Sequence, residues 1–103
     1  MPKRTKNYEV DLIEKLKDSE FAVEYLNASL EDEDTGSDER FLIALRHVAQ
    51  AHGMTSVSER SGMTRQAMYR ALSETGNPEF SSLRALLNAI GLKLSVEQKK
   101  DVS

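Results

Sequence analysis

The sequence predicts an all-α protein, on two observations, with one possible exception at the C-terminus. Over most of the chain apolar residues recur three and four positions apart, as in residues 83–90, which is the period of a helix with one buried face. Glycines stand at the ends of these periodic segments, where helices commonly stop. Residues 92–96 alternate apolar and polar side chains, the period of a strand, so one short C-terminal β-strand is also possible.

Length and composition limit the class of protein. The chain has 103 residues, a net charge of −3 and no cysteine. This length suits one small domain plus an extension, whose small core leaves room for support from dimerisation or a partner. Without cysteine there are no disulfides or thiolate metal sites, which fits a reducing cytosol. No apolar run reaches the length of a membrane span or resembles a signal peptide, so we expect a cytoplasmic protein.

Residues 1–36 form the predicted N-terminal extension, which is acidic and helical. Residues 1–7 are polar and basic and are expected to be extended or disordered. Apolar side chains in the next positions mark a short amphipathic helix, and Ser19 is a candidate cap for a second one. The second helix ends at an acidic run, residues 31–34, whose carboxylates oppose the helix dipole, so this run is predicted to become a linker.

Charge divides the chain into two parts. Residues 1–36 carry five lysines and arginines against ten acids, a net charge of −5, whereas residues 37–103 carry nine against seven, a net charge of +2. Nucleic-acid-binding proteins are usually basic, so the overall acidity argues against DNA binding. Because most of the acids lie in the extension, the negative charge argues less strongly against DNA binding by residues 37–103.

Residues 37–96 form the predicted main domain, in which we expect five helices, four of them clear in the apolar pattern. The first is capped by Ser37 or Asp38 and stops at Gly53. Two short helices follow, and then a loop with the sequence Gly-Asn-Pro. Ser81 is the predicted cap of the last clear helix.

The two short helices, residues 54–72, meet at Gly62. Thr64 has the hydroxyl of an N-cap, and the apolar residues after it fall on one side of the second helix. The opposite side has cationic, amide and phenol groups and no acid: Arg65, Gln66, Tyr69 and Arg70. Such groups contact base edges and phosphates in a major groove. The alternative is a solvated helix face, and for Tyr69 also a ring that packs across the domain.

This segment resembles the lambda-repressor-like helix-turn-helix through its first helix rich in small residues, its glycine turn and the Thr-Arg-Gln that opens its second helix. Residues 69–80 extend the resemblance to the HigA-like antitoxins, which are addiction-module antidote proteins. The similarity covers about residues 38–96 and, more loosely, the N-terminal part. Ser58 and Ser61 depart from the pattern, which prefers alanine and an aliphatic residue, so we expect the first helix to be weakly packed.

The resemblance implies the antitoxin of a type II toxin–antitoxin module. Such a protein neutralises a small basic ribonuclease of the RelE/HigB type and represses its own operon as a homodimer on a palindromic operator. The implied contacts to double-stranded DNA come from the helix pair and the start of the last helix: Ser56, Thr64, Arg65, Gln66, Tyr69, Arg70 and Ser81. The alternative is a stand-alone, phage-type transcriptional regulator without a toxin. A third class, an adaptor without DNA binding, is disfavoured by the basic face.

The acidic extension is the predicted toxin-binding surface, because it complements a basic partner and speeds association. Its predicted contacts are aromatic and apolar residues beside a carboxylate: Phe21, Glu24, Tyr25 and Leu26. The alternating segment is predicted either to pair with its copy in a dimer or to lie along the core, through Leu92, Leu94 and Val96. The N-terminal helices are the other candidate for the dimer interface. Residues 97–103 are predicted to be a flexible tail.

Catalysis is not expected. The chain has no recognisable nucleophile–base arrangement, nucleophile elbow or phosphate-binding glycine loop. His47 and His52 are five positions apart, not the four that place two metal ligands on one helix face, and no cysteine completes a zinc set. We therefore expect no metal, cofactor, small-molecule substrate or membrane partner.

Overall fold

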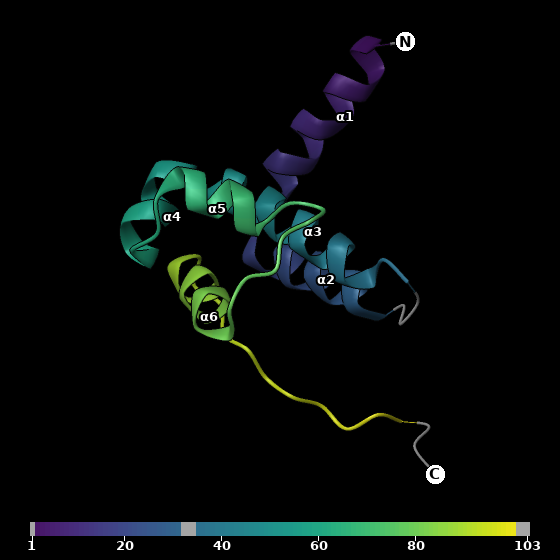
Figure 1. The fold of residues 1–103 in the computed structure, drawn as a ribbon. Coiled ribbons are helices and arrows are strands. Elements are labelled where there is room, and N and C mark those ends of the chain that lie inside the picture. The colour runs from purple at the N-terminus through teal and green to yellow at the C-terminus, as the bar shows by residue number, and fades with distance from the viewer. Residues whose placement is uncertain (1, 32–34, 101–103) are drawn as a thin grey trace.

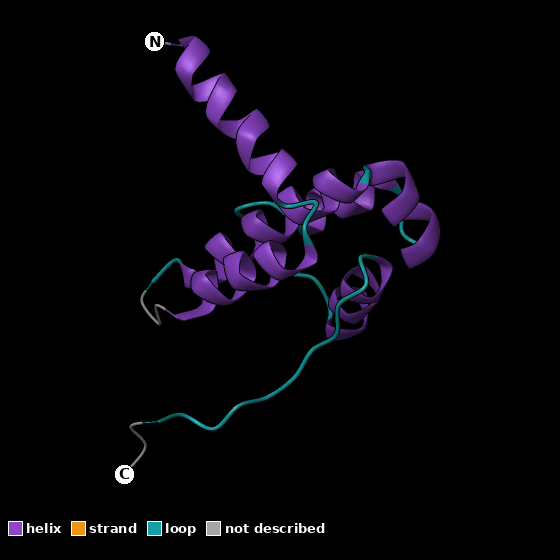
Figure 2. Cartoon of the chain, turned by 180° about the vertical axis from the view of Figure 1, so that it is seen from behind, coloured by secondary structure: helices purple, strands orange, loops and turns teal. Residues whose placement is uncertain are grey.

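Six α-helices are present in the computed structural model, which describes residues 2–31 and 35–100, with side chains from Tyr8 onward (Figures 1 and 2). They are α1 (Pro2–Lys15), α2 (Ser19–Glu31), α3 (Ser37–His52), α4 (Met54–Ser61), α5 (Arg65–Ala71) and α6 (Phe80–Ala89). No strand occurs in these two ranges, so the all-α prediction is confirmed. None of the described helices is long and apolar enough to cross a lipid bilayer.

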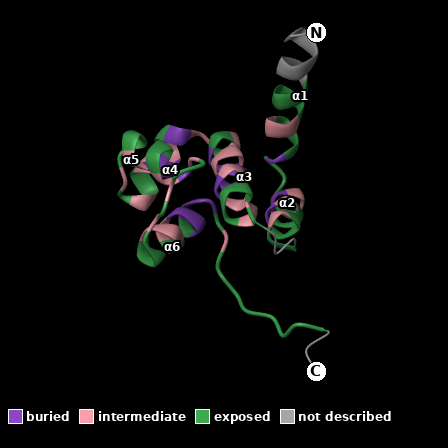
Figure 3. Ribbon diagram, turned by 45° about the vertical axis from the view of Figure 1, so that its right-hand side comes forward, coloured by how far each residue is buried: buried purple, intermediate pink, exposed green. Residues whose placement is uncertain are grey.

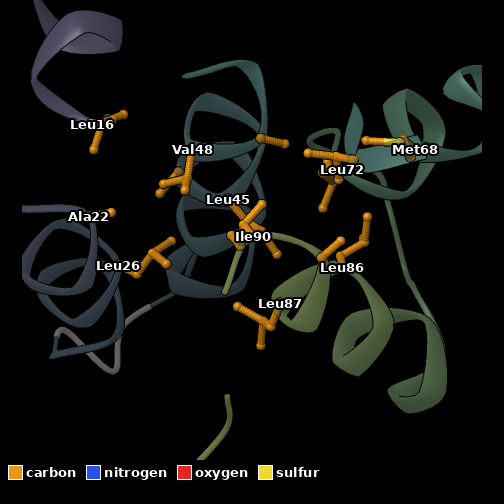
Figure 4. Close-up of a cluster of buried hydrophobic side chains, with 14 of the residues drawn as sticks. Leu16, Ala22, Leu26, Leu45, Val48, Met68, Leu72, Leu86, Leu87 and Ile90 are labelled. Atoms are coloured by element: carbon orange, nitrogen blue, oxygen red, sulfur yellow. The ribbon is translucent and has the colours of Figure 1, made fainter. Parts of the chain in front are cut away.

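The core is built around α3. α1 and α2 pack against it, and so does α4, which also contacts α5 and α6. Figure 4 shows Leu45 and Val48 of α3 between the side chains of α2 and those of the α5–α6 region. The largest fully buried side chains come from this centre and its surroundings: Leu16, Leu45, Val48, Val57, Met68, Leu72 and Leu86.

The N-terminal helices share this core. Leu16, Ala22 and Leu26 are at most 5% exposed and belong to the same buried cluster as the α3 side chains. The division into an extension, residues 1–36, and a main domain, residues 37–96, stays a prediction, but apolar packing crosses the proposed boundary. The first turns of α1 project away from the other helices in Figure 1. Figure 3 shows buried segments in α2, α3, α4 and α6.

The expectation that residues 1–7 are extended or disordered was wrong, because α1 begins at Pro2. Proline suits the first position of a helix, since its ring already has a helical φ angle and its missing N–H would have had no partner there. Polar composition alone does not prevent a helix, and the basic side chains in this stretch belong to good helix formers.

Two predicted caps are displaced by one residue. Asp18, not Ser19, caps α2: its Oδ1 accepts a hydrogen bond of 3.4 Å from the second amide of the helix. Gly36, with φ of 104°, occupies the N-cap position of α3, and neither predicted residue, Ser37 or Asp38, caps that helix. Where several polar residues adjoin, their sequence does not determine which of them ends outside the helix.

The C-terminal part also differs from expectation. Four helices, α3 to α6, follow Gly36 in the described residues, so the prediction of five was wrong. α6 begins at Phe80 after Glu79, and Ser81 therefore lies within its first turn and does not cap it. Residues 92–99 are extended without forming a strand, because a strand needs a neighbour for its backbone hydrogen bonds. Within the acidic run and the tail, residues 32–34 and 101–103 lie outside the described residues.

Candidate functional site

α4 and α5 meet at Gly62 in a tight turn, as predicted. Gly62 is left-handed, with φ of 78°, and its amide donates to the carbonyl of Ser58 at 3.0 Å, which closes the last turn of α4. Thr64 is extended, and its Oγ1 accepts a hydrogen bond of 3.0 Å from the amide of Ala67. The predicted N-cap is therefore confirmed, and local bonds set the direction in which α5 leaves the turn.

Ser58 and Ser61 hold this turn together through hydroxyl bonds that we did not predict, and the expectation that α4 is weakly packed stays a prediction. The hydroxyl of Ser58 donates to the carbonyl of Met63, and Oγ of Ser61 accepts from the Met63 amide at 3.2 Å. Alanine and an aliphatic residue at these positions would form neither bond. Two serines directly before a turn glycine are the signal that we missed, since serine hydroxyls often bind nearby backbone groups.

α5 has one buried and one exposed face. Met68, and Leu72 just after the helix, have no exposed surface and anchor it in the core. The outward face consists of the four predicted residues, all exposed: Arg65, Gln66, Tyr69 and Arg70. Within the described residues their side chains form no hydrogen bond or ion pair, and the Tyr69 ring is 40% exposed. The structure thus brings these groups together on one accessible surface.

The two predicted serine contacts lie on neighbouring helices. Ser56 is half-buried in the first turn of α4, which begins at Met54, and Ser81 is exposed in the first turn of α6. Beside Ser81 the structure shows a pair that we did not predict: the guanidinium carbon of Arg84 lies 5.9 Å from the centre of the Phe80 ring. Phe80 is 66% exposed, so this cation and ring are accessible at the start of α6.

The predicted toxin contacts lie on different sides of α2. Leu26 is buried, and Phe21 packs partly buried against the core, so both have structural roles. Glu24 is exposed. Tyr25 is half-buried, and its hydroxyl lies 2.9 Å from Nδ1 of His47 on α3. Their role in partner binding stays a prediction. Glu24 is exposed, Phe21 and Tyr25 are partly exposed, and Leu26 is buried.

The Tyr25–His47 pair makes stability depend on pH. Burial, and secondarily the charge of Arg46, lower the pKa of His47, although Glu9 opposes them; burial, followed by the proximity of Tyr8, raises the pKa of Tyr25. When neutral His47 carries its proton on Nε2, its Nδ1 accepts a hydrogen bond from the Tyr25 hydroxyl. Because the pKa of His47 is lower in the folded than in the unfolded chain, the unfolded chain takes up more protons, and stability falls as the pH drops below about 6.5.

We expect His47→Gln to reduce this acid sensitivity. Thermal unfolding followed by circular dichroism at pH about 7.5 and about 5.5 compares the loss of Tm in the two proteins. The wild type should lose more than the variant, and Tyr25→Phe, which removes the hydroxyl bonded to the ring, should also alter the response. Identical losses in wild type and His47→Gln would show that the pair makes no contribution.

Fold and surfaces together define a small all-helical protein with a basic exposed face on α5 and an acidic helix, α2. Comparison with known proteins narrows this class. Residues 6–98 match the family described as "Probable addiction module antidote protein", and the chain belongs to this family. The match includes most of α1 and all of α2, the N-terminal part in which the resemblance was looser.

One relative is similar over most of its length but has no described activity. An uncharacterised protein of Haemophilus influenzae (strain ATCC 51907 / DSM 11121 / KW20 / Rd) is 33% identical over 90 residues, which cover 87% of this chain and 90% of that protein. No solved structure matches the chain significantly. Membership of an antidote family indicates a regulatory protein with a toxin partner of some kind.

Proposed function

We propose that this protein is the antitoxin of a type II toxin–antitoxin module. It is a cytoplasmic, non-enzymatic homodimer that neutralises a small basic ribonuclease of the RelE/HigB type. It also represses its own operon through a lambda-repressor-like helix-turn-helix formed by α4 and α5. The family match supports the antidote role and favours it over a stand-alone transcriptional regulator.

The observation that carries the DNA-binding proposal is the exposed basic face of α5 on a turn held by hydrogen bonds. Residues at the start of a recognition helix contact base edges, so Arg65 and Gln66 are the proposed base contacts. Arg70 also reaches base edges, while Thr64 and Tyr69 contact the backbone or a thymine methyl group. Backbone amides near Ser56 and Ser81 hold phosphates at the starts of α4 and α6.

The C-terminal segment, residues 92–99, is the proposed dimer interface because it has exposed apolar side chains. Leu94 and Val96 are 41% and 97% exposed, and Leu92 packs partly against the core. Pairing with the same segment of a second copy would cover these side chains and supply the missing backbone partners. A two-fold axis there would present two α5 helices to successive major grooves.

We expect Arg65→Ala or Gln66→Ala to weaken binding to the promoter of the protein's own operon by about 1–3 kcal/mol and to relax sequence preference. Fluorescence anisotropy with a labelled promoter duplex and a scrambled duplex, at one fixed salt concentration, measures both effects. Gln50→Ala, which removes an exposed amide from α3, is the matched control. Equal losses on both duplexes would reassign the residue to phosphate contact, and no DNA binding by the wild type at low salt would refute the repressor function.

A further inference from the structure

A groove with a volume of about 770 Å³ lies between α2, α3 and the loop that follows α5. Its walls are mainly apolar, and Tyr25 and Ala28 come from α2, Ile43 from α3 and Thr75 from the loop. Figure 1 shows this loop reaching from the end of α5 towards α3 before it turns to α6. The groove is large enough for the side chains of a short protein segment.

Acidic side chains near the groove favour a basic partner. α2 and the first three residues of α3 contain five acids and no lysine or arginine. Glu39 and Glu74 line the groove from α3 and from the loop. Arg40 lines it as well and already interacts within the chain. Apolar walls among carboxylates favour a basic protein segment with an apolar anchor over nucleic acid or an anionic ligand.

The loop wall of the groove is fastened to α5. A Cβ atom on Gly76 would lie 2.0 Å from the carbonyl oxygen of Ala71, so the loop backbone passes directly against the end of the helix. The hydroxyl of Ser73 donates to the carbonyl of Arg70 at 2.9 Å, and the Gly76 amide donates to the carbonyl of Ser73 at 3.0 Å. Thr75, between these fixed points, is therefore held in place relative to α5.

We propose that this groove is the docking site for the toxin, through a basic segment that inserts an apolar side chain between α2 and the loop. The inference rests on the proposed antitoxin function and adds where on the protein the toxin binds. It keeps Tyr25 as a contact and adds Ala28, whereas Phe21 does not line the groove and Leu26 is buried in the core. A toxin bound here touches the loop that supports α5, so toxin binding and operator binding share one structural element.

The test uses the full-length chain and the purified product of the adjacent gene. Ala28 is exposed, so Ala28→Arg fills the groove and adds a cation without disturbing the core. We expect it to weaken binding at least about tenfold in calorimetry. Glu39→Lys with Glu74→Lys should slow association and reduce its dependence on salt. The matched control is Asn27→Arg. Asn27 is also exposed on α2, but it lines a second groove, beside the C-terminal segment.

The possible outcomes separate this proposal from the function on which it rests. If the wild type binds the product of the adjacent gene and both groove variants bind it with wild-type affinity, the proposed docking site is wrong. The antitoxin function is then still supported. If Asn27→Arg loses binding instead, the toxin binds in the second groove, and the proposed docking site is also wrong. If the wild type does not bind the product of the adjacent gene, both the proposed docking site and the proposed antitoxin function are wrong. Circular dichroism of every variant confirms that a loss of binding is not a loss of fold.

Discussion

Replacing Gly76 with alanine is expected to destabilise the protein by about 3 kcal/mol, as severe overpacking does. The new Cβ would lie 2.0 Å from the carbonyl oxygen of Ala71 and 2.7 Å from its carbon. Both are backbone atoms at the end of α5, so no side chain can rotate away to relieve the clash. Either the loop must leave α5 or the last turn of the helix must open.

Gly62→Ala is the matched control, since Gly62 also lies at the end of a helix. Its φ of 78° disfavours alanine, by about 1–2 kcal/mol, but nothing lies within 4 Å of the added atom. Urea unfolding followed by circular dichroism, at one fixed protein concentration, compares the two free energies of unfolding. A loss at Gly76 no larger than that at Gly62 would show that the loop yields easily and does not support α5.

Replacing Leu16 with alanine is expected to reduce the free energy of unfolding by about 2–5 kcal/mol. Leu16 follows α1 directly, has no exposed surface and packs in the same cluster as the side chains of α3. Its truncation leaves a cavity where the N-terminal helices join the rest of the molecule. The size of the loss therefore measures how firmly α1 and α2 are attached.

Leu30→Ala on α2 is the control for this experiment, because Leu30 is 51% exposed and its truncation should change stability by only about 0.5 kcal/mol. Urea unfolding again gives the free energies. A single transition in Leu16→Ala indicates one cooperative unit, whereas two transitions support the predicted boundary at residue 36. A loss as small as that in Leu30→Ala would contradict the structural role of Leu16.

The sequence predicted the helix pair well because its signals are local. The turn at Gly62 and the cap at Thr64 depend on residues within a few positions of one another, and both have the predicted geometry. The exposed face of α5 follows from helical periodicity alone. For the same reason all six helices were expected, and the errors lie at their ends and in the one extra helix.

The remaining differences arise where the sequence offers several equivalent choices or where the answer depends on distant residues. Neighbouring polar residues at 18 and 19 are both able to cap α2, and the structure uses Asp18. On α2, the apolar pattern showed which residues share a side but not how the helix is rotated against α3. That rotation buries Leu26 and leaves Val23 exposed. The pairing of Tyr25 with His47 joins residues 22 positions apart and has no local signal.

The separation of tasks within α4 and α5 also bears on how this protein can evolve. Met68 and Leu72 attach α5 to the core, while Thr64 and the serines of α4 set its orientation. The outward side chains at positions 65, 66, 69 and 70 contribute to neither task. Substitutions there are therefore nearly neutral for the fold, and a duplicated gene can acquire a new binding preference at these four positions without first acquiring compensating changes elsewhere.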